Sequence, residues 1–130
     1  MDTVEVVAAI IVRGYEVFVA KRGRGEYTDV WEFPGGRVEE GETPRAALKR
    51  QIRDTLGLEI SVGDEIRVIE FDYPTYHLKM HCFSCSILSG YLSLKKHKEV
   101  KWISENGLDS VEWVPSDREI LPLISELHNM

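Results

Sequence analysis

The sequence predicts an α/β (α+β) domain in which a mixed β-sheet is sandwiched between α-helices. Three observations support this. The chain opens with an apolar run rich in β-branched residues, it contains one strongly marked helix after Thr43, and two long extended segments and a second helix follow that helix. At 130 residues the chain is near the common size for one hydrophobic core. We therefore expect a single domain over residues 1–130.

The first two strands are predicted to form a hairpin. Val4–Val12 is almost continuously apolar, which is typical of a strand covered on both faces. Arg13–Tyr15 has the composition of a tight turn, and Glu16–Lys21 alternates as a second strand. A loop then extends from Gly23 to a short extended piece at Trp31–Phe33.

The clearest helix follows Thr43. This threonine is a favourable N-cap, and Pro44 occupies the first helical position, where its missing N–H costs nothing. Gly57 provides a C-terminal stop. The residues predicted to be buried along this helix are Ala47, Leu48, Ile52, Thr55 and Leu56.

The second half of the chain is predicted to be mainly extended. Leu58–Tyr73 and Tyr76–Leu88 form two long antiparallel strands, and Tyr91–Ser93 and Val100–Ile103 are short strand candidates. A last helix opens at Pro115–Asp117. Its expected buried stripe is Ile120, Leu121, Ile124 and Leu127, and Pro122 fits only if it lies within the first turn.

Charge and composition restrict the partners. A net charge of −6 and a pI near 5.2 argue against binding long nucleic acid. A small phosphorylated ligand remains compatible, because a divalent metal can supply positive charge. The apolar run Val6–Val12 is too short to span a membrane, and the acidic N-terminus does not resemble a signal peptide. We therefore expect a cytoplasmic protein.

Several residues that often form sites have ordinary structural explanations here. Cys82 and Cys85, three apart on a strand, should point to opposite faces as buried, inert thiols. His77 and His81 are interpreted as sheet residues without a ligand. The segment from Lys95 to Lys98 is interpreted as a solvated turn that could help to attract a triphosphate. Trp102 and Trp113 are expected in the core.

The stretch from Trp31 to Pro44 carries the strongest functional pattern. Gly35, Gly36 and Gly41 precede a capped helix, so the backbone can approach a ligand and offer amide donors to it. A glycine-rich turn without a ligand remains the plain alternative.

Residues from Gly36 to Leu58 resemble the Nudix box. Gly36, Glu42, Arg50, Ile52, Gly57 and Leu58 all fall in register with that motif. The preceding Trp-Glu-Phe-Pro-Gly-Gly resembles the MutT branch, and Val4–Ile11 resembles the opening strand of bacterial CTP pyrophosphohydrolases. The resemblance extends over nearly the whole chain and implies a Nudix fold.

The resemblance also implies an activity. Such a hydrolase would convert a nucleoside triphosphate, CTP-like, dCTP-like or modified, to the monophosphate and pyrophosphate with Mg²⁺ or Mn²⁺. The metal ligands it implies are the Gly35 carbonyl, Gln51, Asp54 and Thr55, and the catalytic residues it implies are Glu42, Arg50, Gln51 and Asp54.

This sequence departs from the family pattern at the metal positions. Gln51, Asp54 and Thr55 stand where the family has glutamates, and Lys96 aligns with a further family glutamate. Lys96 would repel a metal but could attract phosphates directly, and Glu39 or Glu99 could supply a missing carboxylate. Two plainer roles stay open. Asp54 could form a helix ion pair with Arg50, and Glu42 could order the loop through Arg50 rather than bind metal.

The resemblance places base recognition at Arg22, Phe33 and Asp117. An aspartate can accept hydrogen bonds from an exocyclic amine, which cytosine and adenine both carry. Each residue has an alternative. Arg22 could be a solvated charge, Phe33 a core residue, and Asp117 a helix N-terminal residue stabilised by the dipole.

Three functions remain possible from the sequence. The first is a working pyrophosphohydrolase acting on a small-molecule nucleotide, as a monomer or homodimer. The second is a catalytically impaired nucleotide-binding or regulatory Nudix domain, suggested by Gln51, Asp54 and Thr55. The third is an interaction module that uses only the fold.

Overall fold

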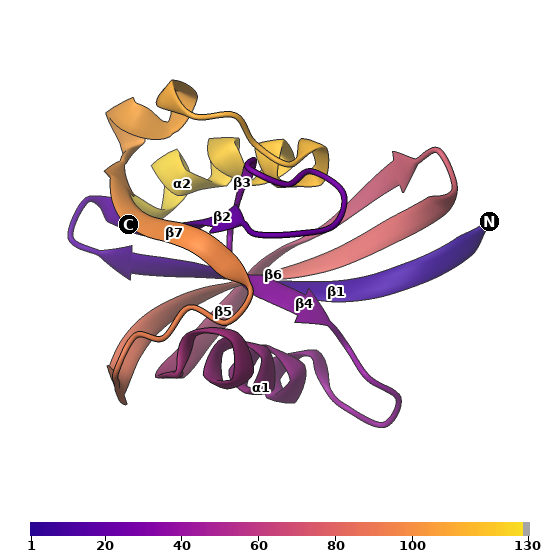
Figure 1. Cartoon of the computed structure of the whole chain (residues 1–130), viewed down its shortest axis with the longest axis horizontal. Helices are drawn as coiled ribbons and strands as arrows, with labels where there is room; N and C mark the ends of the chain where they lie inside the picture. Colours follow the sequence, from indigo (N-terminus) through magenta and orange to yellow (C-terminus); the bar gives the residue numbers. More distant parts are fainter. Residues whose placement is uncertain (129–130) are drawn as a thin grey trace.

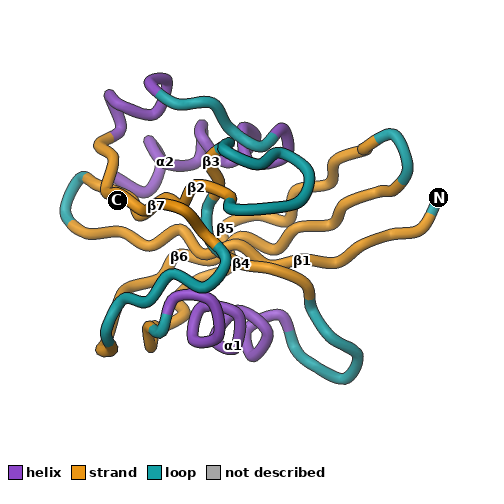
Figure 2. Tube along the Cα trace, in the orientation of Figure 1, coloured by secondary structure: helices purple, strands orange, loops and turns teal. Residues whose placement is uncertain are grey.

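A computed structural model describes residues 1–128 as a mixed sheet with α1 on one face and the C-terminal helices on the other (Figure 1). Figure 2 shows the same two layers of helix on opposite sides of the strands. The elements, in chain order, are β1 (Asp2–Arg13), β2 (Glu16–Arg22), β3 (Trp31–Glu32), β4 (Gly35–Arg37), α1 (Pro44–Leu56), β5 (Leu58–Tyr73), β6 (Tyr76–Gly90), β7 (His97–Ser104), the 3₁₀ helices η1 (Glu105–Ser110) and η2 (Pro115–Ile120), and α2 (Leu121–His128).

The strands pair in the order β3-β2-β1-β6-β5. β1 runs parallel to β6 along most of its length, and it forms the predicted hairpin with β2, where Val12 faces Val17. The predicted antiparallel pair of β5 and β6 is also present. β4 adds antiparallel to β1, and β7 adds antiparallel to β2. The predicted α/β class with a mixed sheet between helices is confirmed.

Two apolar cores flank the sheet because side chains alternate along β1. Val7, Ala9 and Ile11 pack toward α1, whereas Ala8 and Ile10 pack on the side of the C-terminal helices. Cys82 and Cys85 lie in opposite cores, free and buried, as predicted. Burial raises the pKa of both thiols to about 12, so neither forms a reactive thiolate near neutral pH.

Helix α1 begins and ends as predicted. The Thr43 hydroxyl oxygen accepts the Ala46 N–H at 3.2 Å, and Gly57 adopts a left-handed conformation with φ 72°. The five residues of the predicted stripe are all buried.

The last helix is divided. Residues 115–120 form η2 and α2 begins at Leu121, so Pro122 lies in the first turn, as its chemistry requires. Ile120 and Ile124 are fully buried, but Leu121 and Leu127 are only partly buried. Leu123, which the predicted stripe omitted, is buried instead.

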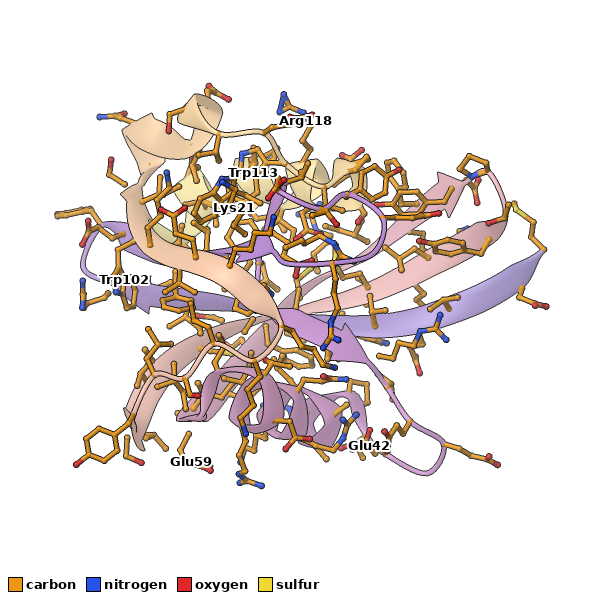
Figure 3. The ribbon with its side chains drawn as sticks, viewed as in Figure 1. Lys21, Glu42, Glu59, Trp102, Trp113 and Arg118 are labelled. Carbon is orange, nitrogen blue, oxygen red and sulfur yellow. The ribbon has the colours of Figure 1, made fainter. Side chains whose placement is uncertain are left out.

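One sequence interpretation is wrong and two hold only in part. Tyr91–Ser93 forms no strand but part of a loop (Figure 2). The Ser93 and Lys95 N–H groups donate to carbonyl groups at the C-terminal end of α1. Trp102, on β7 (Figure 3), is partly buried against the core, with the Arg13 guanidinium 3.9 Å from its ring centroid, whereas Trp113 is buried in the core. His97, within the predicted solvated turn, begins β7, and its side chain is only 5% exposed. No helix among residues 1–128 is long and apolar enough to cross a membrane.

The pairing of β4 with β1 depends on Gly35. A Cβ at this position would lie 1.9 Å from the Val7 carbonyl oxygen, a backbone atom that cannot move alone. We expect Gly35→Ala to destabilise the protein by at least about 2 kcal/mol, measured by denaturant unfolding. Gly36→Ala is the comparison and should cost less, because the atoms nearest its Cβ belong to the Gln51 side chain, which can move away by giving up its hydrogen bond to Arg37. Equal stability of Gly35→Ala and wild type would contradict the register of β4.

Candidate active site

Two side chains of helix α1 donate hydrogen bonds to one backbone carbonyl of β4. The Arg37 carbonyl oxygen accepts hydrogen bonds from Arg50 Nη2 and Gln51 Nε2, both at 3.1 Å. The side chain of Gln51 lies flat against Gly36, where an added Cβ would be 2.5 Å from its amide carbon. Glycine at this position therefore lets the helix approach the strand closely.

The loop between β4 and α1 is held by an ion pair. Glu42 lies in this loop beside α1 (Figure 3). Arg50 Nε and Nη2 donate to its two carboxylate oxygens at 2.7 and 2.8 Å, and Glu42 also accepts the Glu39 N–H at 2.9 Å. These hydrogen bonds, first of all those from Arg50, lower the pKa of Glu42 to about 2. The structure thus contains the ion pair with Arg50 that the sequence offered as the alternative to metal binding by Glu42. Asp54 lies 3.9 Å from Arg50 Nη1, so its helix pair is present as well.

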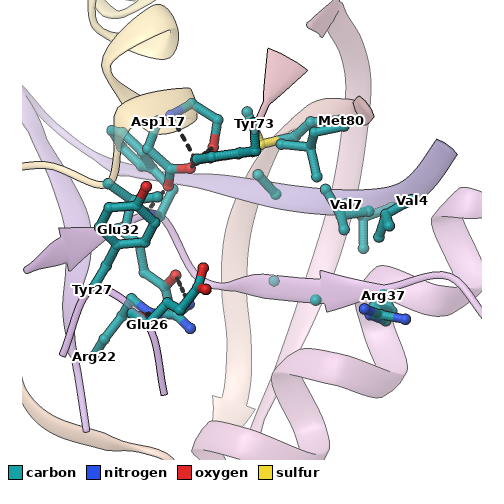
Figure 4. Close-up of a pocket in the computed structure, with 18 of the residues that line it drawn as sticks. Val4, Val7, Arg22, Glu26, Tyr27, Glu32, Arg37, Tyr73, Met80 and Asp117 are labelled. Atoms are coloured by element: carbon teal, nitrogen blue, oxygen red, sulfur yellow. Dashed lines mark hydrogen bonds and ion pairs between the residues drawn. The ribbon is translucent and has the colours of Figure 1, made fainter. Parts of the chain in front are cut away.

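A cavity of about 490 Å³, here called the aromatic cavity, opens beside the sheet (Figure 4). Tyr27, Tyr73 and Tyr76 line it together with Asp117. Tyr73 and Tyr76 stack with their ring centroids 5.1 Å apart, and Tyr27 lies 6.0 Å from Tyr73. Sequence reasoning did not select these tyrosines, because Tyr27 lies in the loop after β2, Tyr73 and Tyr76 flank the β5–β6 turn, and no motif connects the two segments.

Asp117 is buried at the wall of the aromatic cavity. Its Oδ2 accepts the Phe33 N–H at 2.8 Å, and its Oδ1 accepts the Ser116 hydroxyl at 3.3 Å. Burial, followed by the nearby charge of Glu32, raises the pKa of Asp117 to about 7. The carboxyl group therefore carries a proton in an appreciable fraction of molecules near neutral pH, and can then donate as well as accept.

The Phe33 side chain is too deeply buried for its ring to stack on a nucleotide base. Its side chain is 3% exposed and its ring stacks on Trp113, with centroids 5.1 Å apart at 10°. The Phe33 backbone also fixes Asp117, as described above. Its main contacts are therefore those of a core residue, although it borders the cavity.

A second cavity of about 600 Å³, here called the charged cavity, lies against β4 and α1. Gln51, Asp54 and Thr55 line it, but Glu42 does not. The two cavities adjoin, because the same residues border both: Arg22, Glu32, Gly35, Gly36 and Arg37. Arg22 Nη1 donates to Glu32 Oε1 at 2.8 Å, so this arginine is fixed at the junction.

The described residues do not fit the multinuclear metal centre that the family pattern implies. Thr55 is buried and its hydroxyl donates to the Gln51 carbonyl, while the Gln51 amide N–H is bonded to Arg37. Within residues 1–128 no group of three or more histidine, cysteine, aspartate or glutamate residues could hold a metal ion. Asp54 and Glu39 remain, and both lie within 4 Å of the Arg50 guanidinium.

Of the two replacement carboxylates considered in the sequence, only Glu39 reaches the charged cavity. Glu99 lies on β7, 4.0 Å from Lys21, and is not part of the cavity wall. Lys96 does reach the cavity.

Comparison with known proteins gives a consistent result. A profile described as the NUDIX domain matches residues 2–126. The chain belongs to the Nudix family. A CTP pyrophosphohydrolase of Escherichia coli is 31% identical over 93% of this chain and 90% of its own. A Mycobacterium tuberculosis protein named provisionally as 8-oxo-dGTP diphosphatase 2 is 38% identical over 87% and 82%.

The fold of this Nudix chain matches that of solved relatives. A crystal structure described as the MutT Nudix hydrolase from Burkholderia pseudomallei has a TM-score of 0.85, with 21% identity, over 94% of this chain and 98% of the other. The curated relatives of this Nudix domain are thus named as diphosphatases and pyrophosphohydrolases, which are hydrolases acting on acid anhydrides.

The ion pair of Glu42 predicts a pH dependence of stability. Because its pKa is lowered from about 4.5 to about 2 on folding, the stabilisation is present above pH 4.5 and is lost as the pH falls toward 2. Glu42→Gln should lower the melting temperature at pH 7 but much less at pH 2.5. Melting curves across this range test it, with Glu40→Gln as control. An equal loss at both pH values would contradict the assignment.

The amide of Gln51 predicts a response to metal. Gln51→Glu removes the hydrogen-bond donor to the Arg37 carbonyl and places a carboxylate beside that oxygen. In metal-free buffer the free energy of unfolding should therefore fall by about 1 kcal/mol, and the melting temperature should fall with it. Mg²⁺ should then raise the melting temperature of Gln51→Glu more than that of wild type. Gln51→Ala, which loses the donor without gaining charge, should show no Mg²⁺ response. An unchanged stability of Gln51→Glu without metal would remove this role for the amide.

Proposed function

We propose that this Nudix domain hydrolyses a nucleoside triphosphate to the monophosphate and pyrophosphate. In this reaction water adds across the anhydride between the α- and β-phosphates, and that P–O bond breaks. The observation that carries the proposal is the pair of adjoining cavities, one walled by tyrosines and Asp117, the other by cations around β4 and α1. Their shared border at Arg22 and Gly36 would lie between the nucleoside and the phosphates.

The aromatic cavity supports recognition of a base that carries an exocyclic amine. Tyr27 and Tyr73 offer ring surfaces, and Asp117 offers a carboxyl group fixed by the Phe33 N–H. CTP, dCTP or a modified nucleotide are the candidate substrates, in keeping with the names of the E. coli and M. tuberculosis relatives. In this proposal Arg22, Phe33 and Asp117 form the substrate-binding set, with Phe33 acting through its backbone.

The residues on α1 have distinct proposed roles. Glu42 and Arg50 hold the loop, Gln51 fixes the Arg37 carbonyl, and Asp54 is the helix carboxylate that borders the phosphates. A single Mg²⁺ or Mn²⁺ carried by the triphosphate would polarise its phosphates, with Asp54, Glu39 and the Gly35 carbonyl as the available oxygen ligands.

A second function has support from the same residues. The bonded amide of Gln51 and the buried hydroxyl of Thr55 replace two carboxylates, which favours a domain that binds a nucleotide without efficient hydrolysis. Both functions require a nucleotide to bind in the cavities. They differ in whether the bound nucleotide is hydrolysed.

Pyrophosphate release from CTP, dCTP, dGTP and 8-oxo-dGTP with Mg²⁺ or Mn²⁺ separates these functions. We expect turnover of at least one triphosphate, and a loss of at least about tenfold for Asp54→Asn, because no other helix carboxylate borders the cavity. Asp64→Asn, on β5 and away from the charged cavity, is the matched control. No pyrophosphate, together with nucleotide-dependent melting shifts, would reject hydrolysis and leave the binding domain. If neither pyrophosphate release nor a melting shift is observed, only the interaction module remains.

A further inference from the structure

Three cationic side chains of the charged cavity have no partner within residues 1–128. Arg24, Arg37 and Lys96 are exposed, border the cavity, and make no hydrogen bond or ion pair through their side chains. They come from the loop after β2, from β4 and from the loop before β7. A single solvated cation would need no explanation. Three from separate segments around one cavity, in a chain of net charge −6, form a favourable environment for a polyanion.

The backbone at Lys96 is fixed on two sides. Its carbonyl oxygen accepts the Gly23 N–H at 3.2 Å, and the preceding Lys95 N–H donates to the Thr55 carbonyl at 3.2 Å. A Cβ at Gly23 would lie 2.7 Å from the Lys96 carbonyl oxygen, so this contact needs glycine. The segment before β7 therefore connects the end of α1 to the loop after β2, and these contacts place Lys96 at the wall of the charged cavity.

The next residue anchors the loop further. The His97 side chain is 5% exposed, and its Nε2 lies 2.9 Å from Glu32 Oε2. Glu32 in turn accepts from Arg22 at the junction of the two cavities. Lys96 thus lies next to a partly buried chain of three hydrogen-bonded side chains, and does not belong to a free surface turn.

The charges around the cavity leave a positive excess. Two of its cations are already neutralised in part, because Arg22 pairs with Glu32 and Arg50 pairs chiefly with Glu42. The remaining carboxylates of the wall, Glu39 and Asp54, lie on the side of Arg50. The cations of the wall are Arg22, Arg24, Arg37, Arg50 and Lys96, and its carboxylates are Glu32, Glu39 and Asp54.

We propose that Arg24, Arg37 and Lys96 bind the polyphosphate group directly and replace the multinuclear metal centre that α1 cannot hold. The inference rests on the proposed function, since it concerns the phosphate part of the same site. Guanidinium and ammonium groups form charge-assisted hydrogen bonds to phosphate oxygens and supply the charge that bound metal ions would otherwise supply. Lys96 stands where the family resemblance predicts a glutamate, so the sign of the charge at that position is reversed.

Two consequences follow for binding. The affinity for a triphosphate should persist without divalent metal, and it should fall as salt increases, because the contacts are exposed and screened. A site that depends on preloaded metal ions would show neither behaviour in metal-free buffer.

Calorimetric titration with inorganic tripolyphosphate and with CTP tests the proposal, using full-length protein in metal-free buffer and in Mg²⁺. We expect wild type to bind both ligands without metal. Lys96→Glu should weaken metal-free binding by about tenfold or more. Lys95→Glu is the matched control, because it makes the same charge change one residue away and outside the cavity wall. Melting curves establish that each variant is folded, and Arg37→Gln provides a second test outside the Lys96 loop.

The outcomes are distinct. Wild-type binding that appears only with Mg²⁺, or equal losses in Lys96→Glu and Lys95→Glu, would overturn direct cation binding while leaving the proposed function intact. No binding of CTP in either buffer, with no pyrophosphate release, would reject the proposed function and this inference together. Metal-free binding that Lys96→Glu and Arg37→Gln weaken and Lys95→Glu preserves would establish it.

Discussion

The Arg50 guanidinium is the group on which the rest of the site depends. It lies on α1, yet its hydrogen bonds go to Glu42 in the preceding loop and to the Arg37 carbonyl of β4. Strand, loop and helix are consequently fixed relative to one another by one side chain. This is a strong arrangement, because both Glu42 oxygens are engaged by a planar donor that remains charged at any accessible pH.

That fixed geometry explains why substitutions at the metal positions need not destroy the site. Helix carboxylates at positions 51 and 55 would hold metal ions, and such ions would supply positive charge next to the loop. Here the Gln51 amide reaches the Arg37 carbonyl directly, and a carboxamide can donate this hydrogen bond where an ionised glutamate cannot. The Thr55 hydroxyl is satisfied within its own helix. These contacts hold the loop in place, and in the proposed binding mode the charge needed by a polyphosphate comes from nearby cations.

Much of the fold could be predicted from local chemistry. Thr43, Pro44 and Gly57 mark both ends of α1, and the apolar alternation around the first turn identifies the β1–β2 hairpin. β4 could not be predicted, because Gly35 and Gly36 have low strand propensity and their pairing is decided by the free edge of β1. Strand pairing with β2 also overrides the polar composition around His97, whose side chain contacts Glu32.

The site was predicted unevenly for similar reasons. The family resemblance pointed to α1 and to Asp117, which are motif positions, and the plain alternative for Phe33 describes its packing on Trp113. The tyrosines of the aromatic cavity and the fixed placement of Lys96 follow from long-range packing. The position of a lysine or arginine in the sequence does not show whether its side chain forms an ion pair in the folded protein.

The most direct measurement is a crystal structure of the protein with a non-hydrolysable CTP analogue, obtained in metal-free buffer. We expect the base to lie against Tyr73 and Asp117, and the phosphates to lie between β4 and the Lys96 loop with the Arg50 contacts unchanged. Phosphates that bind away from β4, or a loop that releases Arg50 to admit them, would contradict it.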